Sequence, residues 1–326
     1  MITRRDKPTK DEPIPEAQPG WIKTVLDQQE FTSIDEVNAF LGKVQTSHNS
    51  EPREKFQGLS PELMHKLLTK PFDSPEVAVF HSPPPAVADT PFMRLFLMLT
   101  DALRDNGLRA TAKGNLPRNF CREAAKAYWG EEEYAVATRY CGINNETDFM
   151  PIRVVRHVAE CAEMIRLNGS RWSLTESGQT LLDTEGLVGA FFPLFRTFTQ
   201  RFNWGEQDGY PEALILQGSF LFTLALLAKH GGEWRVDSFY ADQFLSAFPT
   251  VIDREFGSSH FHIYDDRAQP FRLCYSVRIL ERFAAFWGLT EAEEVSEEEA
   301  DYQMSAGRRV RRLPLLVDLV TFPWLD

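Results

Sequence analysis

Apolar residues recur every three or four positions over long parts of the chain, and this spacing predicts a mainly α-helical protein. The segment 150–167 shows the pattern best, because Ile152, Val155 and Val158 fall on one face of the expected helix. Another helix is expected at 91–105, where apolar residues cover most faces and an Asn-Gly pair follows. Short strand-like runs lie between these helices, so we expect a mainly α fold with short β-hairpins.

Polar cap residues mark the start of two helices near the N-terminus. Ser33 is followed three residues later by Glu36, which is the capping-box pattern. Ser60 precedes a proline at the first helical position, and this arrangement predicts a second helix. The proline triplet that begins at Pro83 cannot continue a helix, so an extended connector is expected to lead into the main body.

The stretches "LRDNGLRATAKGNLPR" and "IRLNGSRWSLTESGQTLL" repeat one pattern about sixty residues apart. Each contains Asn-Gly, then a strand-like run that ends in Thr111 or Thr175, then a glycine three residues later. The glycine of an Asn-Gly pair adopts positive φ at little cost. We therefore expect a helix to end at Asn106 and again at Asn168. The chain should then return as a strand, and the threonine should cap a new helix.

The elements expected after residue 90 run helix, helix, helix, hairpin, helix, which is the order of a winged-helix domain. In such a domain the third helix enters a DNA groove and the hairpin forms the wing. A looser copy of this pattern closes the chain, so the sequence predicts tandem degenerate winged-helix-like units with an N-terminal helical cap. The expected parts are a flexible tail at 1–20, a helical cap with a proline-rich connector at 21–90, a winged-helix-like domain at 91–200 and a second helical, winged-helix-like domain at 201–326.

Three stretches carry a family resemblance. "GLRATAKGNLPRNF" and "RVVRHVAECAEMIRLNGSRWSLTESGQTLL" resemble the C-terminal winged-helix-like module of plasmid ORF-three-type bacterial proteins, and "FQGLSPELMHKLL" is similar to a segment of a wider bacterial family. The resemblance covers residues 92–190. It implies an α-rich, winged-helix-like fold, and it assigns no activity and no catalytic residue to this chain.

Charge limits the kinds of nucleic-acid contact that are expected. The net charge of −12 argues against a protein coated with phosphate-binding residues, although a local basic face can coexist with an acidic whole. The basic side chains come from the expected third helix of the first winged-helix-like unit, which also carries Arg166, from its hairpin, and from the segment that follows the first Asn-Gly turn. The candidate nucleic-acid-binding residues are Lys113, Arg118, Arg122, Arg153, Arg156, His157 and Arg171. A solvated helix face, with arginines paired to glutamates one turn away, explains the same charges.

The most concentrated positive charge is "RRVRR", which begins at Arg308 and follows the acidic tract "EAEEVSEEEAD". A hairpin that places one run opposite the other would match their charges strand against strand. Phosphate binding by this run is the alternative.

Two other clusters are candidates for sites. The motif "HFHIYDD" could supply metal ligands, namely His260, His262, Asp265 and Asp266, although a loop bounded by glycine and proline explains it as well. The turn "FNWGEQDGY" could line a pocket with Trp204, Asp208 and Tyr210, or fix a loop to the core through the same side chains. The chain contains no GxxxxGK[ST], GxGxxG, GxSxG or HExxH motif, so we expect no cofactor.

These observations favour a non-enzymatic nucleic-acid-binding or regulatory protein with DNA as its partner. The alternative is a protein-interaction or scaffold module that binds no nucleic acid, and the third hypothesis is a metal-dependent hydrolase at His260 and His262. No stretch has the uninterrupted apolar length of a membrane span, and the first residues lack the apolar core of a secretion signal. We therefore expect a cytoplasmic protein without membrane contact.

Overall fold

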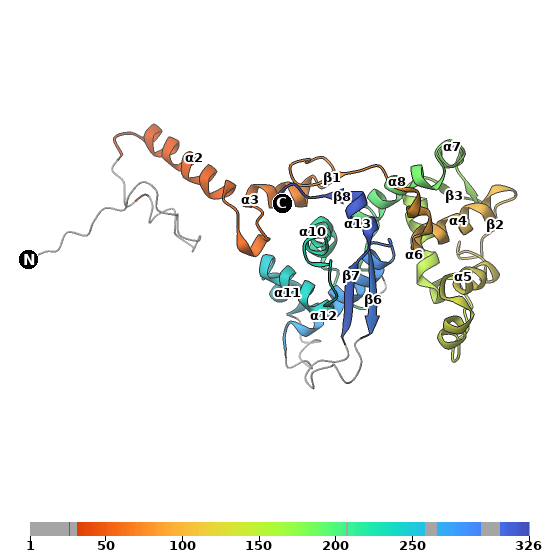
Figure 1. Cartoon of the computed structure of the whole chain (residues 1–326). Helices are drawn as coiled ribbons and strands as arrows, with labels where there is room; N and C mark the ends of the chain where they lie inside the picture. The colour runs from red at the N-terminus through yellow and green to blue at the C-terminus, as the bar shows by residue number, and fades with distance from the viewer. Residues whose placement is uncertain (1–25, 27–30, 207, 258–265, 295–306, 326) are drawn as a thin grey trace, which may run out of the picture. The chain divides into compact units, whose positions relative to one another are not determined.

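The structure is a computed structural model that describes residues 26, 31–206, 208–257, 266–294 and 307–325 (Figure 1). The tail expected at 1–20 lies outside these residues. Helices dominate, and the strands form small antiparallel sheets, so the expected mainly α fold with short hairpins is confirmed. The chain divides into two compact units, Met1–His65 and Lys66–Asp326. Within the described residues, no helix is both long enough and apolar enough to cross a membrane.

The helices expected near the N-terminus are present with their predicted caps. Helix α2 spans Ile34–Ser50, and the Ser33 side chain accepts a hydrogen bond from the backbone N–H of Glu36 at 3.2 Å. Helix α3 spans Pro61–Thr69, where the Ser60 hydroxyl accepts from the N–H of Leu63 at 3.2 Å. A short 3₁₀ turn, η1, lies between them at Glu54–Phe56.

The proline-rich connector forms no α-helix, as expected, and its extended part is tied to the C-terminal end of the described chain. Strand β1 (Val79–Phe80) pairs antiparallel with β8 (Val320–Thr321). The indole N–H of Trp324 donates to the Val77 carbonyl at 2.9 Å, and this bond reinforces the pairing. A 3₁₀ turn, η2 (Pro85–Asp89), then leads to Thr90, which caps the first helix of the main body.

The first half of the main body forms one sheet surrounded by helices. The strands lie in the order β2-β4-β3, and both pairs are antiparallel. The central strand, β4, is therefore the last of the three along the chain. The elements in chain order are α4 (Pro91–Arg104), β2 (Leu108–Arg109), α5 (Arg118–Ala137), η3 (Glu146–Asp148), α6 (Met150–Cys161), β3 (Ile165–Asn168), β4 (Arg171–Leu174) and α7 (Glu176–Thr184).

The two repeated stretches meet in this sheet. The strand after the first Asn-Gly pairs with the strand after the second, so that Leu108 lies opposite Trp172. Gly107 has a φ of +64°, and a Cβ there would lie 2.3 Å from the Trp172 carbonyl oxygen. The first glycine is therefore required both for the left-handed turn and for the close approach of the two strands.

The second repeat differs from its prediction at the helix end. Helix α4 stops at Arg104, before Asn106, as expected, but α6 stops at Cys161, and Asn168 is the last residue of strand β3. The expected helix through 167 was wrong because the chain reverses at Glu163, whose φ is +59°, and then pairs with β4. The Asn-Gly pair makes the turn of the hairpin instead.

The two threonines also behave differently. The Thr175 hydroxyl accepts from the N–H of Gly178 at 3.0 Å and caps α7, as predicted. Thr111 caps no helix, because its hydroxyl accepts from the N–H of Asn115 at 3.1 Å and closes a turn. Helix α5 begins only after Pro117, since a proline holds the residue before it in an extended conformation.

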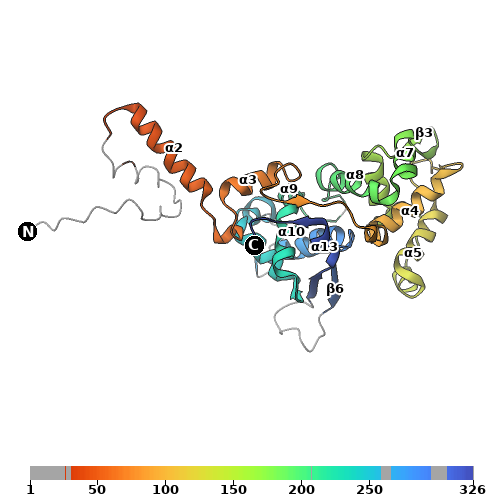
Figure 2. The same ribbon diagram turned by 45° about the horizontal axis from the view of Figure 1, so that its top comes forward.

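The second half repeats the topology of the first. Its sheet order is β5-β7-β6, so the last strand is again central and the first strand again pairs with it. Helices α10 and α13 lie side by side over this half (Figures 1 and 2). The elements are α8 (Gly186–Gln200), α9 (Leu214–Gly218), α10 (Phe220–His230), β5 (Arg235–Val236), α11 (Asp237–Ala247), η4 (Ile252–Phe256), α12 (Gln269–Tyr275), the π-helix η6 (Ser276–Ala285), β6 (Thr290–Glu294), β7 (Arg308–Arg312) and α13 (Pro314–Leu319).

The predicted charge match across the last hairpin is confirmed. Strand β7 contains the arginine run, and the register places Arg311 opposite Glu291 and Arg309 opposite Glu293. The guanidinium of Arg311 lies 2.5 Å from the Glu291 carboxylate, and that of Arg309 lies 4.0 Å from Glu293. These arginines neutralise the facing strand.

Aromatic side chains of α8 join the two halves in one core. The ring of Phe198 contacts Phe92 of α4, with centroids 6.4 Å apart, and Phe283 of η6 at 5.9 Å. Trp287 stacks on Phe92 at 4.1 Å and meets the edge of Phe195 at 5.0 Å. In the second half, α12 continues directly into η6, and the two form the third long helix of that half. Because α8 contacts elements of both halves, it fixes α6 and η6 near each other.

Gly178→Ala should destabilise the protein by about 1–3 kcal/mol, the usual cost of overpacking. A Cβ at Gly178 would lie 2.3 Å from the Met164 carbonyl oxygen, which is backbone and cannot move away cheaply. The matched control is Gly218→Ala at the end of α9, where no atom lies within 4 Å of the added carbon. Urea unfolding followed by circular dichroism compares the two variants, and equal unfolding midpoints would contradict the packing described for Gly178.

Candidate functional site

The third helix of the first half holds a buried arginine. Arg156 of α6 has a side chain that is only 7% exposed, and its Nε donates to Oε1 of Glu146 at 2.5 Å. Its Nη1 donates to Glu160 one turn later at 3.1 Å. The guanidinium also lies over the ring of Trp172, 4.8 Å from its centroid, so the cation packs against the hairpin strand β4.

Glu146 is fully buried and connects three segments. One of its oxygens binds Arg156, and the other accepts the backbone N–H of Leu116 at 2.8 Å, just before α5. The indole N–H of Trp172 donates to the Gly114 carbonyl at 2.8 Å in the same loop. A buried carboxylate requires such partners because its desolvation is expensive. The cluster therefore positions η3, α6 and the loop before α5 against the sheet.

His157 is kept neutral at pH 7 by its burial and by the arginines beside it. Its Nε2 lies 3.0 Å from Nη2 of Arg156 and accepts from Nε of Arg153 at 3.4 Å. Burial, and next the positive charge of Arg156, lower the pKa of His157 to about 4. Arg153 in turn donates from Nη2 to Glu206 at 2.5 Å, with 14% of its side chain exposed.

Three of the predicted contact residues, Arg153, Arg156 and His157, thus face the interior of the main body. This differs from the open polar helix face that the sequence indicated, because α8 and the segment around Glu206 cover that side of α6. Arg122 is also engaged internally, since its Nε donates to the Ile143 carbonyl at 2.7 Å.

The remaining predicted residues, Lys113, Arg118 and Arg171, are exposed. Arg171 lies on the outward face of the β2-β4-β3 sheet. The register adds two exposed arginines to this face, because Arg109 is directly opposite Arg171 and Arg166 is opposite the residue two positions beyond it. We call Arg109, Arg166 and Arg171 the sheet-face arginines.

Arg109 was not among the contact residues predicted from the sequence, and Arg166, expected on the polar side of the third helix, lies in strand β3 instead. Both lie at strand positions that alternate with apolar residues, and this period of two was the available signal. Within the described residues, no carboxylate lies within ion-pairing distance of the sheet-face arginines. Arg171 instead donates to the carbonyls of Asn106 and Gly107, at 2.8 and 3.2 Å.

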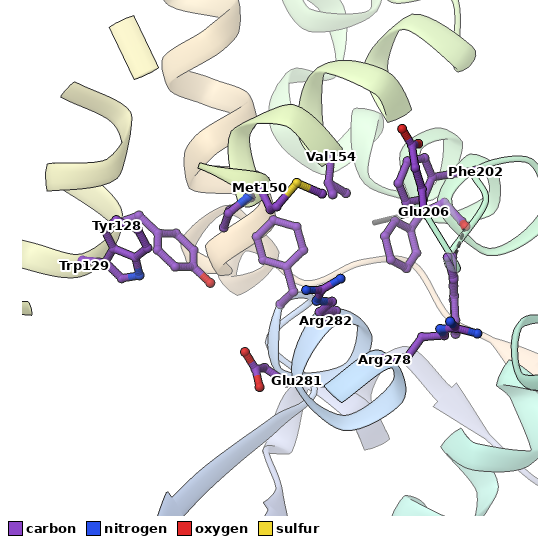
Figure 3. A pocket seen from close by; sticks show the side chains of 13 residues that line it. Tyr128, Trp129, Met150, Val154, Phe202, Glu206, Arg278, Glu281 and Arg282 are labelled. Atoms are coloured by element: carbon purple, nitrogen blue, oxygen red, sulfur yellow. Dashed lines mark hydrogen bonds between the residues drawn. The ribbon is translucent and has the colours of Figure 1, made fainter. Parts of the chain in front are cut away.

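The residues of the predicted pocket have separate roles. Trp204 lines a cavity of the main body, together with Glu206 of the same turn (Figure 3). The carboxylate of Asp208 is buried against the Arg278 guanidinium, with oxygen–nitrogen distances of 2.6 and 2.8 Å. Tyr210 is half-buried, and its backbone N–H donates to the same Asp208 side chain at 3.0 Å.

The predicted metal ligands His260, His262 and Asp265 lie outside the described residues. Asp266 is described, and its carboxylate pairs with Arg272 and accepts the N–H of Ala268 at 2.9 Å. In the part of the chain that the structure describes, no group of three or more histidine, cysteine or acidic side chains could hold a metal ion.

Comparison with known proteins gives one similarity. Residues 89–187 match the family model of the Y4jL N-terminal domain. This range covers α4 to α7, which is the first of the two halves with the same topology. No curated protein and no solved structure matches the chain.

Glu146→Gln should lower the free energy of unfolding by about 3–5 kcal/mol, because it removes the buried counter-charge of Arg156 and leaves that cation only its half-exposed partner Glu160. Glu160→Gln is the matched control, since Glu160 pairs with the same arginine but is 43% exposed. An exposed pair contributes at most about 1 kcal/mol. Denaturant unfolding at pH 7 measures both variants, and equal losses would contradict the role assigned to Glu146.

Stability should fall as the pH falls from 6.5 towards 4, in part through His157. Its folded pKa of about 4 lies below the ordinary value of 6.5, so the unfolded chain binds the extra proton first in this window. His157→Gln keeps an acceptor without the titration, and it should reduce the slope of stability against pH. Because the ring is half-buried, we expect a reduction below about 1.4 kcal/mol per pH unit. His81→Gln, at an exposed histidine, is the control, and an unchanged slope in His157→Gln contradicts this role of the imidazole.

Proposed function

We propose that the protein is a non-enzymatic, regulatory nucleic-acid-binding protein, with winged-helix-like units that contact the phosphate backbone through the outward face of the β2-β4-β3 sheet. Three features support this proposal: the repeated topology, the sheet-face arginines and the orientation of α6. Access to DNA would place the protein in the cytoplasm.

The topology supports the winged-helix-like description. In each half a helix is followed by a short strand, two further helices and a hairpin, and the last strand of the hairpin is central in the sheet. In a winged-helix unit the hairpin is the wing and lies beside the nucleic acid. Strands of other DNA-binding proteins also enter or border the grooves.

The observation that carries the proposal is the unneutralised arginine pair across β2 and β4. Arg109 lies directly opposite Arg171, and like charges in that position destabilise an antiparallel sheet. Within the described chain, no carboxylate compensates them, whereas the arginines of β7 face glutamates on β6. An anionic partner would remove the repulsion, and phosphate oxygens are well suited to guanidinium groups.

The inward orientation of α6 determines the kind of binding. Because the cations of Arg153 and Arg156 are used within the main body, α6 offers no free basic side chain for reading base edges. Contacts from the sheet-face arginines would go to phosphates, which position a protein on a duplex without specifying sequence. We therefore propose binding that is weak, dependent on salt and tolerant of sequence.

Fluorescence anisotropy with a short duplex of mixed sequence tests the proposal. Affinity should fall as the salt concentration rises, with a log–log slope of about −3 for three phosphate contacts. The double variant Arg109→Gln/Arg166→Gln should reduce the slope to about −1. Arg171 is retained in this variant because its guanidinium also binds two backbone carbonyls.

Arg254→Gln provides the matched control, because Arg254 is an exposed arginine of η4 that lies outside the sheet. This substitution should leave the slope unchanged. Absence of binding at low ionic strength, where phosphate contacts are strongest, would refute the proposal. Partners recovered from nuclease-treated lysate would then favour the alternative, a protein-interaction or scaffold module.

A further inference from the structure

A cavity lies between the third helices of the two halves, α6 and η6 (Figure 3). Its volume is about 230 Å³, and Tyr128 and Trp129 of α5 form one end. The cavity is distinct from the sheet-face arginines, and none of its lining residues lies in the β2-β4-β3 sheet. A ligand in this cavity would therefore occupy a site that does not overlap with the sheet face.

Six of the thirteen residues that line the cavity are aromatic. Phe198 contacts Phe202 at 5.6 Å and Trp204 at 5.2 Å between ring centroids, so these rings make one continuous surface. Tyr128 meets the edge of Phe286 at 6.2 Å on the other side. Such walls suit a flat apolar body, because rings gain most from stacked and edge-to-face contacts.

The charged residues around the cavity are neutralised in pairs, with one exception. Arg278 is buried and binds the Asp208 carboxylate with two nitrogens, and it also donates to the carbonyls of Pro211 and Glu212, at 3.0 and 2.7 Å. All three nitrogens of this guanidinium are therefore engaged within the protein.

The two carboxylates that line the cavity are also paired. Glu206 binds Arg153 at 2.5 Å, and Glu281 binds Arg308 at 2.6 Å. Figure 3 shows Glu281 at the edge of the cavity, away from Arg282. Neither carboxylate compensates Arg282.

Arg282 is the exception. Its side chain is half-buried and extends from η6 into the space below α6 (Figure 3). Within the described residues it has no hydrogen bond and no ion pair. The cavity thus contains one uncompensated positive charge among aromatic rings, and a guanidinium in such surroundings favours a planar anion.

A second polar group in the cavity also lacks a partner. The Tyr128 hydroxyl points into the cavity in Figure 3, and no described residue accepts or donates a hydrogen bond to it. Burial, and next the charge of Glu281, raise the pKa of Tyr128 to about 12, so the hydroxyl keeps its proton near neutral pH. It is available as a hydrogen-bond donor.

The helix that presents Arg282 has an uncommon form. Element η6 is a π-helix over Ser276–Ala285, and π-helical turns are rare and concentrate at functional sites. Arg278 and Arg282 are one turn apart on it, and only Arg278 is neutralised within the described part of the protein.

We propose that this cavity binds a small aromatic carboxylate. The aromatic body would lie between Phe286 and the rings around Phe198, and the carboxylate would accept hydrogen bonds from the Arg282 guanidinium and the Tyr128 hydroxyl. This inference assigns the protein a ligand class in addition to its proposed phosphate-binding face.

Isothermal titration calorimetry with 2-naphthoate as the probe, and with benzoate as a smaller one, tests the inference. The neutral isostere 2-naphthamide should bind roughly 10- to 100-fold more weakly than 2-naphthoate, the range expected for hydrogen bonds to a charged group. Equal affinity of the acid and the amide overturns the proposal, and so does the absence of binding by both acids at millimolar concentration.

Arg282→Met keeps an unbranched chain similar to the aliphatic part of arginine and removes the charge, and it should weaken 2-naphthoate roughly 10- to 100-fold while leaving 2-naphthamide unchanged. Tyr128→Phe should weaken the acid by a smaller factor. The control is Arg254→Met, which removes an exposed arginine outside the cavity and should change neither affinity. Thermal unfolding of each variant checks folding, and a folded Arg282→Met protein with unchanged affinity for 2-naphthoate contradicts the site.

Discussion

The buried ion pair between Arg156 and Glu146 is the interaction on which the first half of the main body depends. Neither charge could be buried alone, because removing an ion from water costs several kcal/mol unless a partner compensates it. Glu146 satisfies Arg156 with one oxygen and the chain before α5 with the other. The arginine also packs on Trp172 of the hairpin. A helix, a loop and the sheet are thereby held in one arrangement, and the basic side of α6 is turned inward.

The second half also contains a buried ion pair between an arginine and a carboxylate. Arg278 of its third helix is buried against Asp208, as Arg156 of α6 is buried against Glu146. In both halves, the helix that would read DNA in a winged-helix protein is occupied by internal contacts. Two places in the described chain remain open to other molecules, namely the outward face of the first sheet and the cavity that α6 and η6 line together. Unneutralised arginines occur in both places, which is why an anionic partner is proposed for each.

Local signals in the sequence predicted many element boundaries correctly. Ser33, Ser60 and Thr175 cap the helices that they were expected to cap, because the hydrogen bond from a cap residue to the first turn is formed within a few residues. The pairing of glutamates with the β7 arginines was also predicted correctly, because two neighbouring segments joined as a hairpin pair in a register that the turn fixes. The end of α6 was not predicted correctly, because the apolar residues Ile165 and Leu167 fit the periodicity of a helix as well as that of a strand.

The sequence by itself determined the helical periodicity, the caps, the Asn-Gly turns and the repetition of one pattern along the chain. All of these depend on backbone preferences and on neighbours within about one turn. Only the tertiary structure decided which charges are neutralised. Glu146 and Arg156 are ten residues apart, and Asp208 and Arg278 are seventy apart. No local pattern distinguishes these arginines from Arg109, Arg166 or Arg282. Folding distinguishes them, because a charge remains available to a ligand only where the fold brings no opposite charge to it.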